Sequence, residues 1–344
     1  MKVIYSDDHR LHDGAKEVVF GEMVPLFEMP RRMDMILQRL DATGFGEMRG
    51  PDGFPLDALT AVHDTDYVAF LSTAFTQWQE EVAEIDFALP YVFAMRGLRQ
   101  APADSVFAKL GYYSFDMAVP FVEGTWQAIK TSADVALTGE ALVHGGEWSA
   151  FALCRPPGHH AMRDMGGGYC FVNNAAVAAQ AFIGHGAGRV AILDVDYHHG
   201  NGTQFIFYDR NDVLFVSLHG HPDQEYPHFA GFTDEAGEGR GEGFNLNLPM
   251  RWGTAWDDYG QALAEGCKRI ADYGPDVIVV SLGVDTFKDD PISKFKLENE
   301  DYFRIGEAIA KLGKPTLFVM EGGYAVEAIG INTVNVLIGF EQAV

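Results

Sequence analysis

The stretch RVAILDVDYHHGNG at residues 189–202 carries the strongest fold signal in the chain. It begins with a near-continuous apolar run, 189–195, and ends in acids, histidines and glycines. Such apolar runs suit strands that are buried on both faces of a parallel sheet. Similar runs occur at 213–218, 277–282 and 316–320. We therefore predict a set of buried parallel strands with polar residues at their carboxyl ends.

Helix-like patterns alternate with these runs. This alternation predicts a doubly wound α/β sheet with right-handed crossovers. Because no repeat, low-complexity tract or Ser/Pro-rich linker interrupts the chain, we predict one domain over 1–344. The predicted helices lie at about 30–42, 64–80, 174–184, 255–273, 300–312 and 325–340.

Composition narrows the choice of partners. The chain has 25 Lys+Arg against 49 Asp+Glu among 344 residues, a net charge of −24. This charge argues against nucleic acid and favours cationic ligands, unless it only keeps the surface hydrated. The apolar runs fall short of the roughly 20 residues that a membrane span needs, so we expect no membrane partner. Three cysteines without C-x-x-C spacing indicate neither a disulfide framework nor a thiolate zinc site, and favour the cytoplasm.

Polar side chains follow the predicted strands, at the edge where open α/β sheets bind ligands. Strand alternation would place Asp194, Asp196 and His198 on one side and His199 on the other. Asp285 ends a further strand and can join Asp196 and His198. Two carboxylates and one imidazole suit Zn²⁺ or Fe²⁺ with an open position for water. The alternative is a group of solvated acids beside a hydrogen-bonded histidine.

Three glycine-containing motifs add candidate chemistry. In CRPPGHHA, residues 154–161, a stiff turn presents His159 and His160, side chains suited to moving protons near neutral pH. The glycines of the block GGGYCF at 166–171 would let the backbone, with an aromatic ring beside it, approach a narrow ligand closely. The alternative is an ordinary glycine loop. In EGGY, Tyr324 either belongs to a helix-entry turn or points its phenol at a bound carbonyl.

The segment 84–113 has no clear period and contains Pro90, Pro102 and the pair Tyr112-Tyr113. Stretches of this length without regular structure are more often functional than accidental. A lid, a dimer arm and a surface excursion all remain open from the pattern alone.

These motifs together resemble the zinc-dependent deacetylases of the arginase–deacetylase superfamily. The likeness rests on RPPGHHA, GGYCFVNNAA, ILDVDYHHGNGTQ, SLHG, SLGVDTFKDDP and MEGGY, in that order, over about 150–325. HRLHDGAKEVVFGEMVPLFEMPRRMD and GYYSFD are closest to the bacterial acetylpolyamine amidohydrolases. The resemblance implies a single three-layer α/β/α domain with a mostly parallel central sheet, and hydrolysis of an acetylated amine to acetate and free amine.

The resemblance also implies residue roles. His160 would be the general base and then the general acid, and His159 its electrostatic partner, hydrogen-bonded to Asp194. Tyr324 would polarise the scissile carbonyl. The ligands of the zinc ion, a site that also accommodates Fe²⁺, would be Asp196, His198 and Asp285.

Further roles concern the substrate and a second cation. Gly168 would accept a hydrogen bond from the substrate amide, and Tyr169 and Tyr226 would form the walls of a tunnel. Asn201 stands beside His160 where class I relatives carry Asp, which should affect the His160 pKa. A monovalent cation, K⁺, would lie near Asp194, Asp196, Ser217 and the backbone of Leu218.

The expected substrate is a small cationic acetylated amine. A narrow acidic tunnel, constricted by 84–113 acting as the arm of a homodimer, would favour acetylputrescine and acetylcadaverine. Glu17 and Asp116 are the candidates for meeting the distal ammonium. The block ADSVFAK at 103–109 departs from some acetylpolyamine relatives, which argues against long polyamines such as acetylspermidine.

Three alternatives stay open. A protein or peptide lysine deacetylase would use the same scaffold. A binuclear manganese ureohydrolase would need more Asp and His ligands than the three found, and no D-x-H-x-D block is present. A metal-dependent sensor of a cationic metabolite would leave His159, His160 and Tyr324 unexplained.

Overall fold

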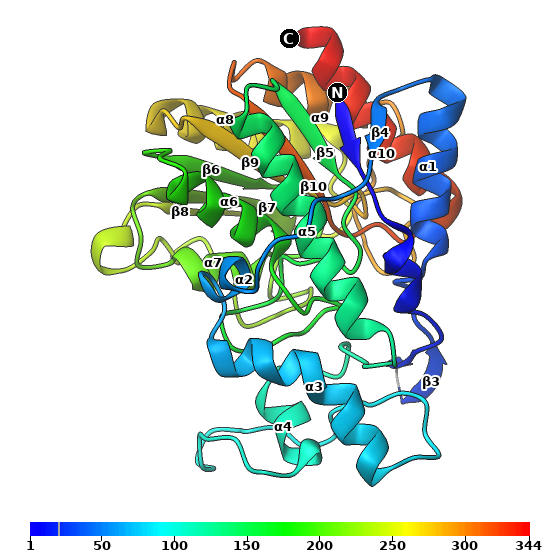
Figure 1. Ribbon diagram of the computed structural model, residues 1–344. Coiled ribbons are helices and arrows are strands. Elements are labelled where there is room, and N and C mark those ends of the chain that lie inside the picture. Colours follow the sequence, from blue (N-terminus) through cyan, green and yellow to red (C-terminus); the bar gives the residue numbers. More distant parts are fainter. Residues whose placement is uncertain (20) are drawn as a thin grey trace.

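The fold is organised around one eight-stranded sheet. The computed structural model describes residues 1–19 and 21–344 (Figure 1). Every paired neighbour in this sheet runs parallel, so the predicted α/β class with a mostly parallel sheet is confirmed. In spatial order the strands are β4 (Glu47–Arg49), β1 (Lys2–Ile4), β5 (Ser149–Ala152), β10 (Thr316–Met320), β9 (Val277–Leu282), β6 (Val190–Asp194), β7 (Val213–Gly220) and β8 (Asn245–Met250).

Helices cover both faces of the sheet. Successive side chains of β9 enter different hydrophobic clusters, Val277 and Val279 on one face and Ile278 and Val280 on the other. Burial on both faces explains why the strands are continuous apolar runs. The predicted helices are α1 (Arg31–Thr43), α3 (Thr65–Glu81), α6 (Asn174–Gly184), α8 (Trp256–Tyr273), α9 (Asp301–Ala310) and α10 (Val326–Ala343).

Several elements lacked a sequence signal. Helix α5 (Thr125–His144) runs along the sheet, and 14 of its 20 residues are buried (Figure 1). Burial on nearly every side leaves no polar stripe, so the 3.6-residue period disappears. The other elements without a signal are short. They are the strands β1, β4, β5 and β8, the helices α2 (Asp57–Thr60) and α7 (Asn201–Phe207), the 3₁₀ turns at Asp7–Leu11 and Gly239–Gly241, and the separate antiparallel hairpin β2 (Lys16–Val19) and β3 (Glu22–Pro25).

The segment 84–113 is more ordered than its pattern indicated. Residues Val106–Tyr112 form helix α4, whose buried Val106 and Leu110 are too few to show a period. Ala88 exchanges two backbone hydrogen bonds with Phe121, at 2.8 and 3.0 Å, and these bonds fix the start of the segment. Between these two points several large apolar side chains remain exposed.

Among the described residues, no helix is both long enough and apolar enough to span a bilayer.

Candidate metal centre and active site

Three predicted ligands converge at the carboxyl ends of two neighbouring strands. Asp196 and His198 follow β6, and Asp285 follows β9, its parallel neighbour. All three are buried, and one ligand atom from each lies within 4.8 Å of the others. Nδ1 of His198 is 3.0 Å from Oδ2 of Asp285 and 3.4 Å from Oδ1 of Asp196.

The donor set fits a divalent metal ion. Two carboxylates and one imidazole, all shielded from water, can hold zinc or iron and leave a position open. Backbone amides orient both carboxylates: Asp196 accepts from the N–H of Gly322 at 2.8 Å, and Asp285 accepts from that of Tyr197 at 2.7 Å. Such outer hydrogen bonds hold a metal ligand in its binding orientation.

The reason these ligands meet differs from the one predicted. Strand β6 ends at Asp194, so strand alternation does not continue to His198. Instead, the Asp194 carboxylate accepts from the N–H of Asp196 at 3.1 Å, and the Asp196 carboxylate accepts from that of His198 at 2.9 Å. Aspartates often form such turns two residues along the chain. The turns direct Asp194 towards His159 and leave His199 near Gln204 and Asn247.

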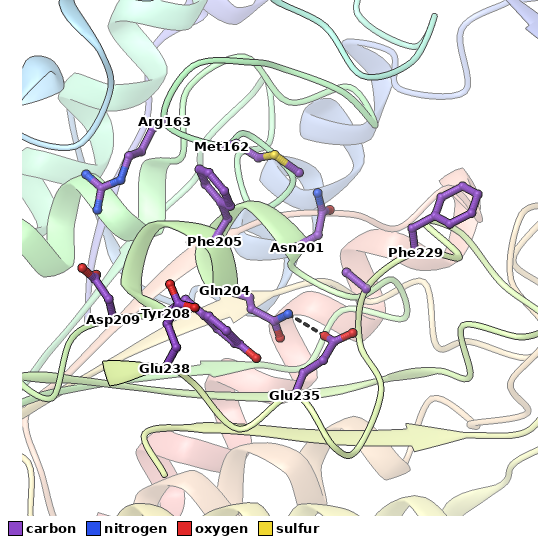
Figure 2. A pocket seen from close by; sticks show the side chains of 11 residues that line it. Met162, Arg163, Asn201, Gln204, Phe205, Tyr208, Asp209, Phe229, Glu235 and Glu238 are labelled. Atoms are coloured by element: carbon purple, nitrogen blue, oxygen red, sulfur yellow. Dashed lines mark hydrogen bonds between the residues drawn. The ribbon is translucent and has the colours of Figure 1, made fainter. Parts of the chain in front are cut away.

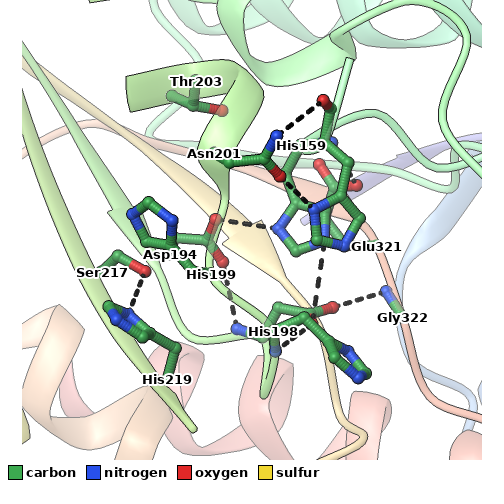
Figure 3. A network of polar contacts seen from close by, with 12 residues as sticks. His159, Asp194, His198, His199, Asn201, Thr203, Ser217, His219, Glu321 and Gly322 are labelled. Atoms are coloured by element: carbon green, nitrogen blue, oxygen red, sulfur yellow. Dashed lines mark hydrogen bonds and ion pairs between the residues drawn. The ribbon is translucent and has the colours of Figure 1, made fainter. Parts of the chain in front are cut away.

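His159 carries the positive charge of the histidine pair. Its Nδ1 lies 3.0 Å from Oδ2 of Asp194, as the resemblance implied (Figure 3). Burial lowers the pKa of His159, but the carboxylates of Asp196 and Asp194 outweigh burial and raise it to about 10. His159 is therefore an imidazolium at neutral pH.

His160 is the neutral member of the pair. Burial, together with the positive charge of the neighbouring His159, holds its pKa well below the usual range. Nδ1 of His160 lies 2.7 Å from Oδ1 of Asn201, whose amide nitrogen donates to the His160 carbonyl at 3.5 Å. The His160 ring therefore donates through Nδ1, which leaves Nε2 to accept a proton.

One cleft of about 710 Å³ opens onto this centre. His160, His198 and Tyr324 line it, together with the wall residues Tyr169 and Tyr226. Burial raises the pKa of the Tyr324 phenol well above the usual range, so it stays protonated and can donate. The cleft thus joins the candidate metal ligands, a neutral base and a phenol donor.

Glycine is required at position 168 of the cleft wall. Gly168 has a φ of +52°, and a Cβ there would lie 2.4 Å from the His160 ring and 2.8 Å from the Tyr226 hydroxyl. No side chain fits in that space without moving the base. The Asp116 carboxylate fixes this wall, because Oδ2 accepts from the Gly168 N–H at 3.0 Å and from the Tyr226 hydroxyl at 2.6 Å.

The two carboxylates predicted to meet an ammonium both line the cleft. Glu17 accepts from the Phe27 N–H and the Tyr169 hydroxyl, each at 2.8 Å. Burial raises the pKa of Glu17 and of Asp116. Both already have protein partners, and contact with a substrate ammonium stays a prediction.

The four residues predicted around K⁺ lie close together. Asp194 on β6 is directly opposite Ser217 on β7, the strand that also holds Leu218. The Ser217 hydroxyl is 2.8 Å from Nδ1 of His219. The ion itself stays a prediction.

A second pocket, of about 450 Å³, lies beside helix α7 and contains none of the metal-ligand group. Figure 2 shows Arg163 near Asp209 on one side and Phe229 on the other. Asn201 is among the residues that line it. Among the residues that line the second pocket, Asn201 connects it to the candidate centre, because Asn201 is the hydrogen-bond partner of His160.

Sequence reasoning missed three buried charged residues that hold the loops of the histidine pair and of Tyr324, namely Glu28, Arg32 and Arg155. Oε1 of Glu28 pairs with Nη1 of Arg32 at 2.7 Å and with Nε of Arg155 at 2.8 Å. Arg32 also donates to the carbonyls of Glu321 and Gly323, beside Tyr324. The only sequence signal of this network was the i,i+4 spacing of Glu28 and Arg32, on either side of Pro30. Such a spacing normally indicates an ion pair on an exposed helix surface.

Glu321 connects the same loops from the other side. Its Oε2 accepts from the N–H groups of Gly158 at 2.7 Å and His159 at 3.2 Å. Burial raises the pKa of Glu321 to about 7, despite the nearby His159 charge. The histidine turn and the Tyr324 loop are therefore tied together at this carboxyl group.

Known proteins match this chain in both sequence and structure. Residues 26–338 match the family model described as the histone deacetylase domain. Acetylpolyamine amidohydrolase 2 of Pseudomonas aeruginosa is 57% identical over 99% of this chain and 99% of its own length. Acetylpolyamine amidohydrolase of Mycoplana ramosa is 47% identical over 98% and 99%. A crystal structure of acetylpolyamine aminohydrolase from Burkholderia pseudomallei superposes with a TM-score of 0.95 at 39% identity, covering 100% and 99%.

The Glu28 network predicts a large stability effect. Glu28→Ala leaves the buried guanidinium groups of Arg32 and Arg155 without their shared carboxylate. We expect a loss of about 3–5 kcal/mol in the free energy of unfolding, measured by urea denaturation. Glu327→Ala is the matched control, because Glu327 forms an exposed pair with Arg31 at 2.6 Å and should cost about 0–1 kcal/mol. Equal losses in the two variants would contradict the assignment.

Proposed function

This chain belongs to the histone deacetylase domain family, and on that basis we propose that it is a metal-dependent amidohydrolase acting on N-acetylated polyamines and diamines. The observation that carries the proposal is the cleft in which a neutral His160 and a protonated Tyr324 lie beside the metal-ligand group. Relatives named acetylpolyamine amidohydrolase match over 98–100% of the chain at 40–57% identity. Two relatives named histone deacetylase match only 55–59% of it.

The metal of the proposal is zinc, with Fe²⁺ as the alternative that the same ligands accommodate. Asp196, His198 and Asp285 would hold it. A bound zinc ion lowers the pKa of water and polarises a carbonyl group. The absence of thiolates from this ligand set also supports a catalytic rather than a structural site.

His160 moves the proton in the proposed mechanism. Nε2 takes a proton from water as the water oxygen attacks the acetyl carbon. When the C–N bond breaks, Nε2 returns that proton to the leaving amine, so the products are acetate and a free amine. His159, kept cationic by Asp194, places a positive charge beside the developing oxyanion and keeps His160 neutral at rest.

Tyr324 supplies the hydrogen bond to the oxyanion. Its raised pKa keeps the proton on the phenol, and a donor of this kind contributes about 3–4 kcal/mol to the transition state. The Arg32 guanidinium carbon lies 4.9 Å from the centre of the Tyr324 ring, so a cation–π interaction helps to hold the ring in position.

The walls of the cleft suit a thin aliphatic chain. The rings of Tyr169 and Tyr226 line the cleft, and the carbonyl of Gly168 would accept from the substrate amide. Glu17 and Asp116 would meet a distal ammonium, which relieves the cost of burying their charge. These features, with the net charge of −24, support acetylputrescine and acetylcadaverine as substrates.

We further propose K⁺ near Asp194, Asp196, Ser217 and Leu218, supported by the facing positions of Asp194 and Ser217. A cytoplasmic location is also proposed. It is supported by Cys154, Cys170 and Cys267, which are all free thiols.

The substrate assay tests the proposal directly. Acetate release would be measured for acetylputrescine, acetylcadaverine, acetylspermidine and an acetyl-lysine peptide, each with and without chelator. We expect the two diamines to give kcat/KM values about tenfold or more above the others, equal to about 1.4 kcal/mol at the transition state. The chelator should abolish all turnover, and added zinc should restore it. Preference for the peptide would favour a lysine deacetylase, and full activity without metal would end the proposal.

Because the hydrogen-bond partner of His160 is the uncharged amide of Asn201, a charged residue at position 201 should shift the pH profile of activity. Asn201→Asp places a carboxylate beside Nδ1 and raises the His160 pKa. Because the base must be unprotonated, a higher pKa leaves less active enzyme at acid pH, and the acid limb of kcat/KM should move to higher pH. Asn201→Ser, which adds no charge, is the control. An acid limb that moves equally in both variants would remove His160 from the role of base.

We propose that the segment 84–113 forms the arm of a homodimer that constricts the cleft. Its exposed apolar side chains support this, with Tyr91 68%, Met95 64% and Leu98 59% accessible. Replacing these three by Ser should convert a dimer into a monomer by light scattering and raise KM for acetylputrescine. Phe229→Ser, at a 94% exposed residue outside the arm, should change neither value. A monomeric parent protein would contradict the arm.

A further inference from the structure

A second cluster of metal-binding side chains lies away from the proposed active site. It consists of Glu140 and His144 on α5 and His185 at the end of α6. The adjoining pocket of about 350 Å³ is also lined by Val277 and Pro315, at the starts of β9 and β10. The active site lies at the opposite ends of these strands, so the two sites are separated by the length of the sheet.

Helix geometry brings the three side chains together. Glu140 and His144 are four residues apart and share one face of the last turns of α5. His185 ends the neighbouring helix α6. Its Nδ1 lies 2.9 Å from Oε1 of Glu140, and its ring stacks on that of His144 with centroids 4.9 Å apart. One ligand atom from each residue lies within 4.8 Å of the others.

The Glu140 carboxylate indicates that this cluster has a ligand. Glu140 is 0% exposed, yet among the described residues its Oε2 has no hydrogen-bond partner. The ion pair with His185 satisfies only Oε1. Buried polar atoms are rarely left in this state without an ordered water or ion to satisfy them. Asp276, which lines the same pocket, already accepts from the N–H groups of Gly188 and Arg189.

We propose that Glu140, His144 and His185 bind a divalent transition-metal ion of the zinc class. Two imidazoles and one carboxylate are preferred by such ions over Ca²⁺ or Mg²⁺, which favour oxygen ligands. Zinc distances of about 2.0–2.2 Å place tetrahedral ligands roughly 3.3 Å apart. Both histidines are exposed and can rotate to close that gap around the buried Glu140. The ion would join the ends of α5 and α6.

This inference does not depend on the proposed activity, and metal binding tests it. Enzyme that holds one zinc per chain would be titrated with ZnCl₂ by calorimetry, with metal analysis after dialysis. We expect a second equivalent in the parent protein. His144→Asn and His185→Asn should each weaken that equivalent at least tenfold and leave the first equivalent and the hydrolytic activity unchanged. Both histidines are exposed, and the asparagine amide keeps a hydrogen-bond donor for Glu140, so we expect each variant to fold, as a thermal melt would check.

Two further variants identify the location of the ion. Asp276→Asn removes a negative charge from the same pocket without removing a ligand, and should keep the second equivalent. Asp285→Asn should lose the active-site ion but keep the ion at Glu140. This variant therefore distinguishes a failure of the Glu140 site from a failure of the proposed function. Binding of one ion only by the parent protein would overturn the inference. So would a second equivalent that survives both histidine substitutions.

Discussion

The buried Glu28 carboxylate is the interaction on which the active-site geometry depends. It pairs with two arginines that reach in different directions, Arg32 to the loop of Tyr324 and Arg155 to the N-terminal segment before α1. Arg155 also directly precedes the turn that carries the histidine pair. The Glu28 carboxylate therefore holds the loop of His160 and the loop of Tyr324 in fixed positions, although the two loops are distant in the sequence. Buried ions need charged partners of this kind, because an unpaired charge in the interior is costly.

The two adjacent histidines acquire different charge states from their surroundings, because His159 is cationic and His160 is neutral. His159 and His160 are both buried, but His159 faces two carboxylates, whereas His160 faces the Asn201 amide and the cationic His159. The charge on His159 is itself one reason why His160 stays neutral. Separating the pKa values of neighbouring groups in this way is a common means of assigning acid and base roles. Here the carboxylates of Asp196 and Asp194 cause the separation, and Asp194 is also the hydrogen-bond partner of His159.

The sequence predicted the strands and helices whose pattern follows from burial, and the three residues that it named as metal ligands lie together in the structure. They meet although β6 ends at Asp194, because local turns rather than strand alternation bring Asp196 and His198 together. Patterns could not reveal α5, which is buried on most sides, or three-residue strands such as β1. Nor could they reveal Glu28, because a charged residue in a sequence normally indicates solvent, and only distant partners make its burial stable.

The hairpin of β2 and β3 forms one side of the cleft without belonging to the main sheet. It contributes Glu17, Val18 and Val19 to the lining, and within the described chain its strands pair only with each other. Substitutions there alter the entrance at little cost to the parallel core. Gly168, in contrast, is enclosed by the His160 ring and the Tyr226 hydroxyl, which leave no room for a side chain. Divergence towards new amines is therefore expected to begin in the hairpin, while Gly168 stays invariant.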